Sequence, residues 1–345
     1  MGNLLRVEDL SISYGSAEQR VQAVRHASFS ISAGEVLGIL GESGSGKSTL
    51  ALSVARMLPA NARYETGTVI FGGKNLLQLT EKQLAGVRGA EIAIIWQDPA
   101  LALNPVMRVG QQIAEVLRAH GCNDRGERAQ RVQGLLAEVG FERPAEVARA
   151  YPHQLSGGQR QRVGIAQALC CQPALVIADE PTSKLDAALQ VEILALLAGL
   201  RKRRRMACLV ISHDSAVFAG WADRMLVMYA GEIVEEGSSE QVFGRPLHPY
   251  SQALVGLSGT ASAAPRQHLP VIAGEPPDMT RLPAGCCFEP RCAERMKVCA
   301  GSSPTPSTPG NWPPKYPTEP RYWSKASRPP GCCWRKAPTP RTRSP

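Results

Sequence analysis

The eight residues "GESGSGKS", at positions 41–48, constrain the fold of this 345-residue chain more than any other feature. They match the pattern G-x-x-x-x-G-K-[ST], in which glycines let backbone N–H groups turn inward toward phosphate oxygens. A predicted strand precedes the loop, and a helix predicted from about Lys47 adds the positive end of its dipole. Because these flanking elements fit the pattern, we favour a phosphate-binding loop in an α/β fold over a glycine-rich turn without a ligand.

The residues of this loop have separate expected tasks. Lys47 is expected to reach the β- and γ-phosphates of a nucleotide, and the hydroxyl of Ser48 to bind Mg²⁺. The loop therefore predicts a nucleotide with β- and γ-phosphates, and Mg²⁺, as ligands. The other positions that we assign to the nucleotide in this segment are Gly41, Ser43, Gly44, Gly46 and Thr49.

A second segment, "ALVIADE" at residues 174–180, is an uninterrupted apolar run that ends in two acids, which predicts a buried strand. We expect Asp179 to hold Mg²⁺ through its water shell. Glu180 would stand at the carboxyl end of the strand, where α/β sheets bind ligands, and could activate an attacking water as general base. The alternative is a solvated strand end, and the phosphate loop upstream argues against it.

Between these segments, "LSGGQ" at residues 155–159 precedes a predicted helix and resembles the signature motif of ABC-type ATPases. Other motifs of that family lie in the expected order along the chain. Tyr14 matches the aromatic residue that stacks on adenine, and Gln97 matches the glutamine of the Q-loop. "SKLD", residues 183–186, matches the D-loop, and His213 matches the switch histidine. Together these motifs are far more specific than any one of them.

The resemblance covers roughly residues 3–256 and implies an ABC ATPase nucleotide-binding domain at 1–256. This domain would have an α/β P-loop NTPase core, an antiparallel β subdomain and a helical subdomain at about 98–160, followed by a small Cys/Pro-rich extension at 257–345. The resemblance also implies a head-to-tail dimer in which the signature contacts the ATP of the partner chain. The implied residues are Ser156, Gly157, Gly158 and Gln159 in the signature, Glu180, His213, Gln97 and Lys47 in catalysis, and Ser48, Gln97 and Asp179 around Mg²⁺.

Several longer stretches resemble the ATPase subunits of dipeptide and oligopeptide importers, a family that also includes nickel importers. These stretches are "QDPALALNPVMRVGQQI", "YPHQLSGGQRQRV" and "RPLHPYSQAL", and "NPVMRVG" is closer to the first of the two ATPase subunits. The resemblance implies a heterodimer with a second ABC ATPase, two membrane permeases and a periplasmic or extracellular substrate-binding protein. The chain would then lie at the cytoplasmic face of the membrane, held peripherally by the permeases.

The hydropathy of the chain agrees with a peripheral subunit. The N-terminal residues lack the apolar core of a signal peptide, and no apolar run approaches the roughly 20 residues of a membrane span. We therefore expect a soluble, cytoplasmic chain whose contact with the membrane comes through a partner.

Two alternative functions remain open. A nickel or metallophore importer ATPase of the same family would have similar motifs, because substrate choice lies mainly in the binding protein and permeases. A soluble ABC ATPase acting on nucleic acid is suggested only by the tail at 260–345, which holds 18 of the 27 prolines and +8 of the formal charge of +9. We interpret this tail as a solvated extension and expect no nucleic-acid partner.

The tail includes "CCFEPRCAERMKVC", residues 286–299, with four of the ten cysteines. Its spacings, C-x₅-C and C-x₆-C, match neither the tight pairs of structural zinc nor ferredoxin runs, so spacing alone selects no metal. The segment resembles the C-terminal extension of oligopeptide-importer ATPases, which in some members holds a [4Fe–4S] cluster. That resemblance implies the ligands Cys286, Cys292, Cys299 and Cys333, and free thiols are the alternative. The remaining cysteines within apolar or helical stretches, which we interpret as core or surface thiols, are Cys122, Cys170, Cys171 and Cys208.

One residue of the D-loop departs from the family pattern. Lys184 stands where a small residue usually precedes the leucine. A cation at the dimer seam could pair with a phosphate or with an acid opposite, or it could weaken one of the two ATP sites.

Overall fold

A computed structural model describes residues 2–15, 20–218, 220–258 and 272–301. Its strands form two sheets. One is antiparallel with strand order β2-β1-β4-β5, and the other has the order β10-β9-β3-β8-β7-β6. The strands are β1 (Asn3–Gly15), β2 (Arg20–Ser32), β3 (Val36–Leu40), β4 (Ala62–Phe71), β5 (Lys74–Asn75), β6 (Ile92–Ile95), β7 (Leu175–Asp179), β8 (Ala207–Ser212), β9 (Arg224–Tyr229) and β10 (Glu232–Ser238).

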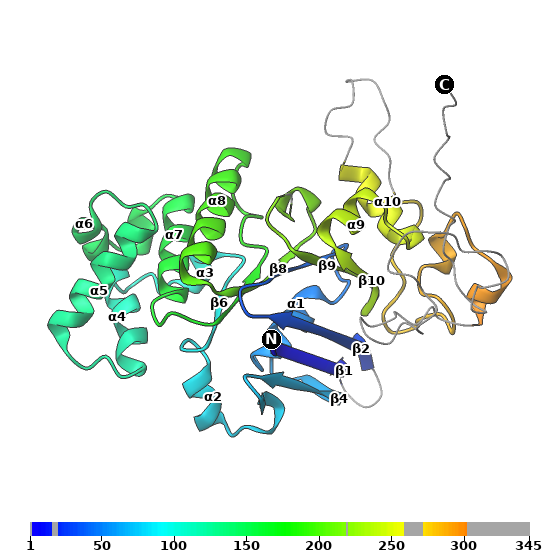
Figure 1. The fold of residues 1–345 in the computed structure, drawn as a ribbon, viewed down its shortest axis with the longest axis horizontal. Helices are drawn as coiled ribbons and strands as arrows, with labels where there is room; N and C mark the ends of the chain where they lie inside the picture. Colours follow the sequence, from blue (N-terminus) through cyan, green and yellow to red (C-terminus); the bar gives the residue numbers. More distant parts are fainter. Residues whose placement is uncertain (1, 16–19, 219, 259–271, 302–345) are drawn as a thin grey trace.

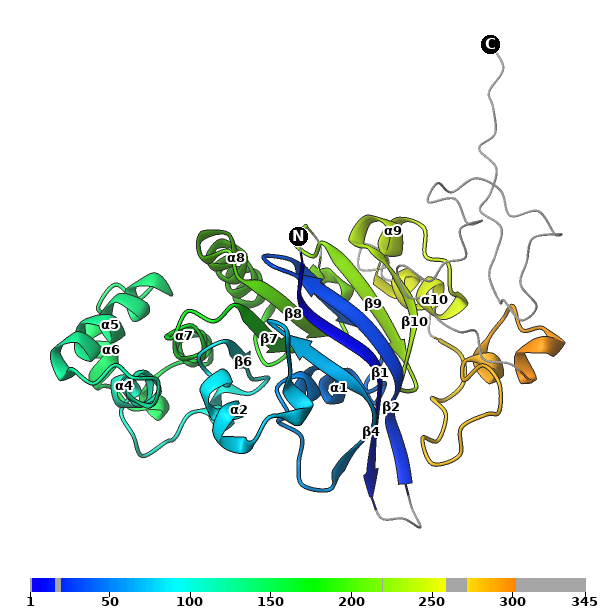
Figure 2. The same cartoon turned by 60° about the horizontal axis from the view of Figure 1, so that its bottom comes forward.

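The helices fall into groups that Figure 1 separates clearly. Helices α4 to α6 gather at one end of the molecule, whereas α1 lies beside the strands and α9 and α10 lie near β9 and β10 (Figures 1 and 2). The α-helices are α1 (Lys47–Val54), α2 (Glu81–Val87), α3 (Pro99–Ala102), α4 (Val109–Ala119), α5 (Arg125–Glu138), α6 (Pro144–Arg149), α7 (Gly157–Ala168), α8 (Ala187–Arg204), α9 (Ser239–Gly244) and α10 (Pro249–Ser258). Short 3₁₀ turns are η1 (Leu76–Gln78), η2 (Pro152–Gln154), η3 (Ser215–Phe218), η5 (Glu289–Arg291) and η6 (Lys297–Ala300).

The centre of the six-stranded sheet is parallel and completely buried. Every residue of β3, β7 and β8 is buried, as their continuous apolar sequences predict. In the register of these strands, Leu40 pairs with Ser212, and Asp179 pairs with Ile211. The carboxyl ends of β3, β7 and β8 therefore meet at one edge of the sheet, and the residues that follow them are brought together.

The antiparallel sheet is the β subdomain that the family resemblance implies. Strand β1 pairs with β2 on one side and with β4 on the other. Its buried side chains, including Val7, Leu10 and Ile12, share an apolar core with β3 and α1. This packing places the end of β1 close to α1, where the Tyr14 hydroxyl lies 3.1 Å from the Thr49 hydroxyl.

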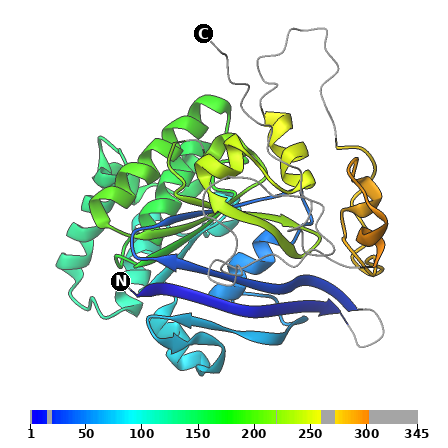
Figure 3. The same cartoon turned by 45° about the vertical axis from the view of Figure 1, so that its right-hand side comes forward.

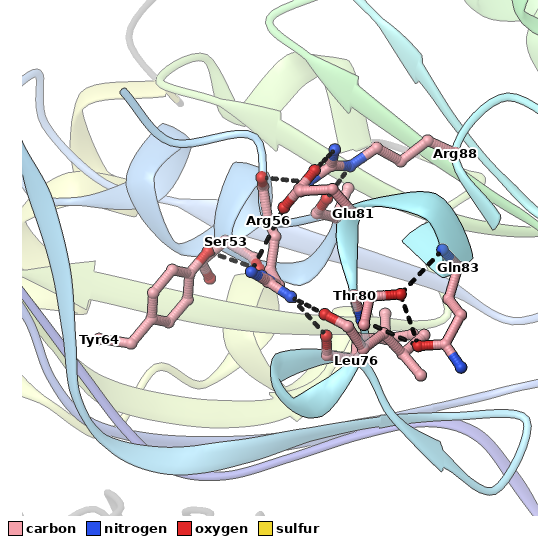
Figure 4. A network of polar contacts seen from close by, with 10 residues as sticks. Ser53, Arg56, Tyr64, Leu76, Thr80, Glu81, Gln83 and Arg88 are labelled. Carbon is pink, nitrogen blue, oxygen red and sulfur yellow. Dashed lines mark hydrogen bonds and ion pairs between the residues drawn. The ribbon is translucent and has the colours of Figure 1, made fainter. Parts of the chain in front are cut away.

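A network of arginines ties the far end of α1 to the segment around α2 (Figure 4). Arg56 donates to the carbonyl of Leu79 at 2.6 Å, and Arg88 donates to the carbonyl of Arg56 at 2.6 Å. Arg88 also pairs with Glu81 at 2.9 Å. These contacts fix the C-terminal end of α1, which is the end far from the phosphate loop. The loop is therefore attached to a helix whose two ends are both held in place.

The described part of the C-terminal extension, residues 272–301, packs beside β9, β10 and α10 (Figure 3). Phe288 is 3% exposed, and its ring centroid lies 5.3 Å from those of both Tyr229 and Tyr250. The extension is thus joined to the body of the protein through an aromatic cluster. Among the helices that the structure describes, none combines the length and apolar character needed to cross a bilayer.

Candidate active site

The phosphate loop is pressed against two strands and leaves no room for side chains at key positions. A Cβ atom on Gly46 would lie 2.2 Å from the Ala23 carbonyl oxygen, and Gly46 has a φ of 97°. A Cβ atom on Gly41 would lie 2.3 Å from the Met228 carbonyl oxygen. Both positions therefore require glycine, which lets the loop curl into the start of α1.

Lys47 is buried within this loop, with 5% of its surface exposed. Its ammonium group donates to the carbonyl oxygens of Gly41 and Glu42, each at 2.8 Å. Burial lowers the pKa of Lys47, although the acids Glu180, Asp179 and Glu42 oppose that shift. The ammonium is therefore held by weak neutral acceptors, which phosphate oxygens can replace with stronger charge-assisted hydrogen bonds.

A hydroxyl and a carboxylate meet where β7 approaches α1. Ser48 Oγ donates to Asp179 Oδ1 at 2.9 Å. Burial raises the pKa of Asp179, whereas the hydrogen bond from Ser48 opposes that shift. Magnesium prefers oxygen ligands, so these two side chains form a donor set that fits it.

Glu180 is the centre of a hydrogen-bonded triad that joins three strand ends. His213 Nδ1 lies 2.9 Å from Glu180 Oε1, and Gln97 Nε2 donates to Glu180 Oε2 at 2.9 Å. Gln97 follows β6, Glu180 follows β7 and His213 follows β8. Glu180 adopts a φ of 43°, a left-handed conformation that is strained for a residue with a side chain. Such strain is most often found at functional sites, where surrounding contacts maintain it.

The signature segment, residues 155–159, lies apart from the phosphate loop of the same chain. Ser156 caps α7, because its hydroxyl accepts a hydrogen bond from the backbone N–H of Gln159 at 3.3 Å. The side-chain oxygen of Gln159 in turn accepts one from the backbone N–H of Ser156 at 2.9 Å. Ser156, Gly157 and Gln159 are exposed, whereas Gly158 is buried against Leu189. Figures 1 and 2 show α7 beside the group of α4 to α6, away from α1. The structure thus does not bring the signature to the phosphate loop within one chain.

Comparisons with known proteins agree with this geometry. The model of the ABC transporter family matches residues 24–183. An oligopeptide transport ATP-binding protein of Escherichia coli is 43% identical over 308 residues, which are 89% of this chain and 91% of that relative. This chain belongs to the family of ABC transporter ATP-binding proteins. As a member of that family, the ABC ATPase binds ATP and Mg²⁺ and is an ATPase.

Further comparisons cover the C-terminal region and the fold of the ABC ATPase. A model described as the C-terminal region of oligopeptide/dipeptide transporters matches residues 234–299. A dipeptide transport ATP-binding protein of Bacillus subtilis is 41% identical over 87% of this chain and 89% of its own length. A solved ATP-binding cassette, described as a dimer in a post-hydrolysis state bound to ADP and Pi, superposes with a TM-score of 0.61 at 28% identity. It covers 68% of this chain and 98% of its own.

In the described part of the ABC ATPase extension, the four thiols of Cys286, Cys287, Cys292 and Cys299 are buried. Burial raises the pKa of the Cys292 thiol, and the nearby Cys286 and Cys299 add to the rise. Nevertheless, in the part of the chain that the structure describes, no three His, Cys, Asp or Glu side chains are arranged to hold a metal ion. Cys333, the fourth expected ligand, lies outside the described residues. The described residues thus give no support for the expected [4Fe–4S] cluster, and the cluster stays a prediction.

The structure also gives the exposure of the cysteines of the ATPase domain and of the D-loop lysine. Cys122, Cys170 and Cys208 are buried, and Cys171 is half-buried, as expected for thiols in apolar or helical stretches. Lys184 is exposed between β7 and α8. The expected pairing of Lys184 with a phosphate or an acid across the dimer seam stays a prediction.

Two residues of the site region were not predicted from the sequence. Glu42 lies inside the phosphate loop at a position that the pattern leaves free, and Arg291 lies in the C-terminal extension. The two side chains form a bidentate ion pair, with N–O distances of 2.7 and 3.1 Å. Because they are separated by 249 positions, no local signal links them.

Proposed function

We propose that this ABC ATPase powers an importer of di- or oligopeptides. The observation that carries the catalytic part is the triad in which Gln97 and His213 each hold one oxygen of Glu180 beside the phosphate loop. The peptide assignment rests on the relatives named above and on the match of residues 234–299 to the C-terminal region of peptide transporters. The same comparisons do not favour the nickel alternative, and the transporter family argues against action on nucleic acid.

We assign the nucleotide contacts to the residues around α1. The N–H groups at the start of α1 and the Lys47 ammonium would bind the β- and γ-phosphates, and Tyr14 would stack on adenine. Ser48, Gln97 and Asp179 would hold Mg²⁺, which supplies charge neutralisation on the phosphates. The buried, mutually bonded pair of Ser48 and Asp179 supports this assignment.

In hydrolysis, Glu180 would accept the proton of the attacking water. Gln97 and His213 each occupy one acceptor position on a different oxygen of Glu180, so each oxygen keeps a lone pair that the water can use. His213 would then turn toward the γ-phosphate, where an N–H donor stabilises the charge that develops. Gln97 would report the state of the phosphates to the segment that follows β6.

We propose a dimer because the signature residues at the start of α7 lie away from the phosphate loop of their own chain. Ser156, Gly157, Gly158 and Gln159 open α7 and would bind the ATP held by the partner chain. A second, different ABC ATPase subunit is the proposed partner. We also propose that the domain ends near residue 256, within the last turn of α10 (Pro249–Ser258), and that 257–345 is a separate extension.

Permeases are the proposed membrane partners, together with a periplasmic or extracellular substrate-binding protein. Apolar side chains gather near Gln97, and Trp96, Leu101 and Val106 are 39%, 87% and 79% exposed. A groove lined by Trp96, Pro99 and Gln161 lies between β6, α3 and α7. A helix of a permease seated in this groove at the cytoplasmic face would contact the segment next to the γ-phosphate sensor.

The test is the substitution Glu180→Gln in the chain assembled with its partner ATPase and permeases. We expect MgATP binding to be retained and turnover to fall by about a hundredfold or more, the usual contribution of a general base. Glu8→Gln, at a surface position of β1, is the matched control and is expected to keep normal turnover. Undiminished hydrolysis by the Glu180 variant would exclude the assigned base.

A further inference from the structure

The C-terminal extension reaches into the phosphate loop through one side chain. Arg291 donates from Nη1 to Glu42 Oε2 at 2.7 Å and from Nη2 to Glu42 Oε1 at 3.1 Å. The Arg291 side chain is only 4% exposed, and the Glu42 side chain is 27% exposed. This is a nearly buried, bidentate ion pair between the extension and the loop, the geometry in which an arginine pair is most specific.

The guanidinium is fixed by further contacts that do not involve Glu42. Arg291 Nε donates to the Ala273 carbonyl oxygen at 3.0 Å, and Nη2 donates to the Ile272 carbonyl oxygen at 3.3 Å. Its carbon Cζ also lies 5.8 Å from the centre of the Tyr229 ring. These contacts within the extension and with Tyr229 orient the Arg291 side chain independently of Glu42. The guanidinium therefore presents a pre-organised pair of N–H donors to the Glu42 carboxylate.

Glu42 has a second tie to the same region. Its backbone N–H donates to the hydroxyl of Tyr250 at 2.8 Å. Tyr250 is fully buried and packs against Tyr229, with ring centroids 4.5 Å apart, and against Phe288 of the extension. Both the backbone and the side chain of Glu42 are thus held by one cluster that the extension completes.

The backbone of Glu42 in turn shapes the phosphate site. Its carbonyl oxygen accepts from Lys47 Nζ at 2.8 Å and from the Ser45 amide at 3.2 Å. Its carboxylate places a negative charge in a loop that must bind the negative charges of a nucleotide. The guanidinium of Arg291 compensates that charge. Without Arg291, the Glu42 carboxylate would repel the phosphates, and partial burial would leave this repulsion only weakly screened by water.

We propose that Arg291 is a positioning residue for nucleotide binding, which holds Glu42 and neutralises it so that the C-terminal extension forms part of the ATP site. The inference rests on the proposed assignment of the loop to ATP. It predicts that the affinity for nucleotide depends on a side chain of the extension, which follows the ATPase motifs by more than 70 residues.

The experiment measures the Kd for MgATP of the purified full-length chain by titration calorimetry. Arg291→Met is expected to weaken binding by about tenfold, as one uncompensated charge near the phosphates would. In the background of Glu42→Gln, the same Arg291→Met change is expected to cost less than about threefold, because no carboxylate remains to be compensated. Arg291→Lys keeps the charge without the fork and should lie between wild type and Arg291→Met.

Arg295→Met is the control, because Arg295 is an exposed arginine of the same extension. It should bind MgATP as the wild type does. Thermal unfolding without nucleotide checks that each variant is folded. If Arg291→Met does not fold, the inference is tested by the Kd of Arg291→Lys and by comparing Glu42→Gln with the double variant Glu42→Gln, Arg291→Met. Equal losses on Arg291→Met with and without the Glu42 carboxylate would overturn the inference, as would an unchanged Kd. Wild-type protein that binds no MgATP would instead overturn the proposed function.

Discussion

The phosphate loop and the C-terminal extension are both packed without long helices or strands, but their positions are fixed in different ways. The loop is held by backbone: Gly41 and Gly46 bring it against the carbonyl groups of two strands. The extension, residues 272–301, is held by side chains, chiefly Phe288 and Arg291. The loop therefore tolerates no added atom at Gly41 or Gly46, whereas each contact of the extension should contribute a separate and smaller amount to stability. The following predictions test that difference.

The largest effect is expected for Gly46→Ala. The new Cβ would lie 2.2 Å from the Ala23 carbonyl oxygen at a φ of 97°, so the loop must move away from the strand. We expect about a thousandfold weaker MgATP binding, as strain and overpacking together cost roughly 4 kcal/mol. Calorimetric titration measures it, with Gly86→Ala as control, since a Cβ there meets open space. A loss below about tenfold would show that the loop is not rigid.

Phe288→Ala tests the extension at its apolar contact. Phe288 is 3% exposed between Tyr229 and Tyr250, so truncation leaves a cavity. We expect the free energy of unfolding to fall by about 3 kcal/mol, measured by urea denaturation. The exposed Lys297→Ala is the matched control on the same segment. A stability equal to that of wild type would mean that the extension does not pack on the body in solution.

His213→Ala is expected to have an intermediate effect on the site. One oxygen of Glu180 would lose its partner, while Gln97 still holds the other. We expect turnover in the assembled importer to fall by about tenfold with MgATP binding retained, because orientation of the base is only partly lost. The surface variant His26→Ala should hydrolyse ATP normally. Weaker MgATP binding with unchanged turnover would show that His213 holds the bound nucleotide and does not orient Glu180.

The smallest effect is expected for Arg25→Ala. Arg25 donates to the Cys287 thiol at 3.1 Å and pairs with Glu232 at 3.3 Å, with its side chain 21% exposed. We expect the free energy of unfolding to fall by about 0.5–1 kcal/mol, as for other partly exposed pairs. Urea denaturation measures it. A loss above about 2 kcal/mol would indicate that the extension depends on polar contacts as strongly as on Phe288.

The two regions also differ in how much of them the sequence could predict. The loop, the buried strand that ends in Asp179 and the switch His213 were predictable, because phosphate binding dictates residue types at fixed local spacing. The contact of Glu42 with Arg291 was not, since it depends on how the extension folds back across the sheet. The cysteines show the same limit: the spacing of Cys286, Cys292 and Cys299 selected no metal, and the structure places them as buried thiols.

The most direct test of the account is ATP hydrolysis by the importer reconstituted in proteoliposomes with its substrate-binding protein. We predict that a peptide-loaded binding protein stimulates hydrolysis, that nickel does not, and that Glu180→Gln abolishes the stimulated turnover. Stimulation by nickel in place of peptide, or stimulated hydrolysis that survives Glu180→Gln, would contradict it.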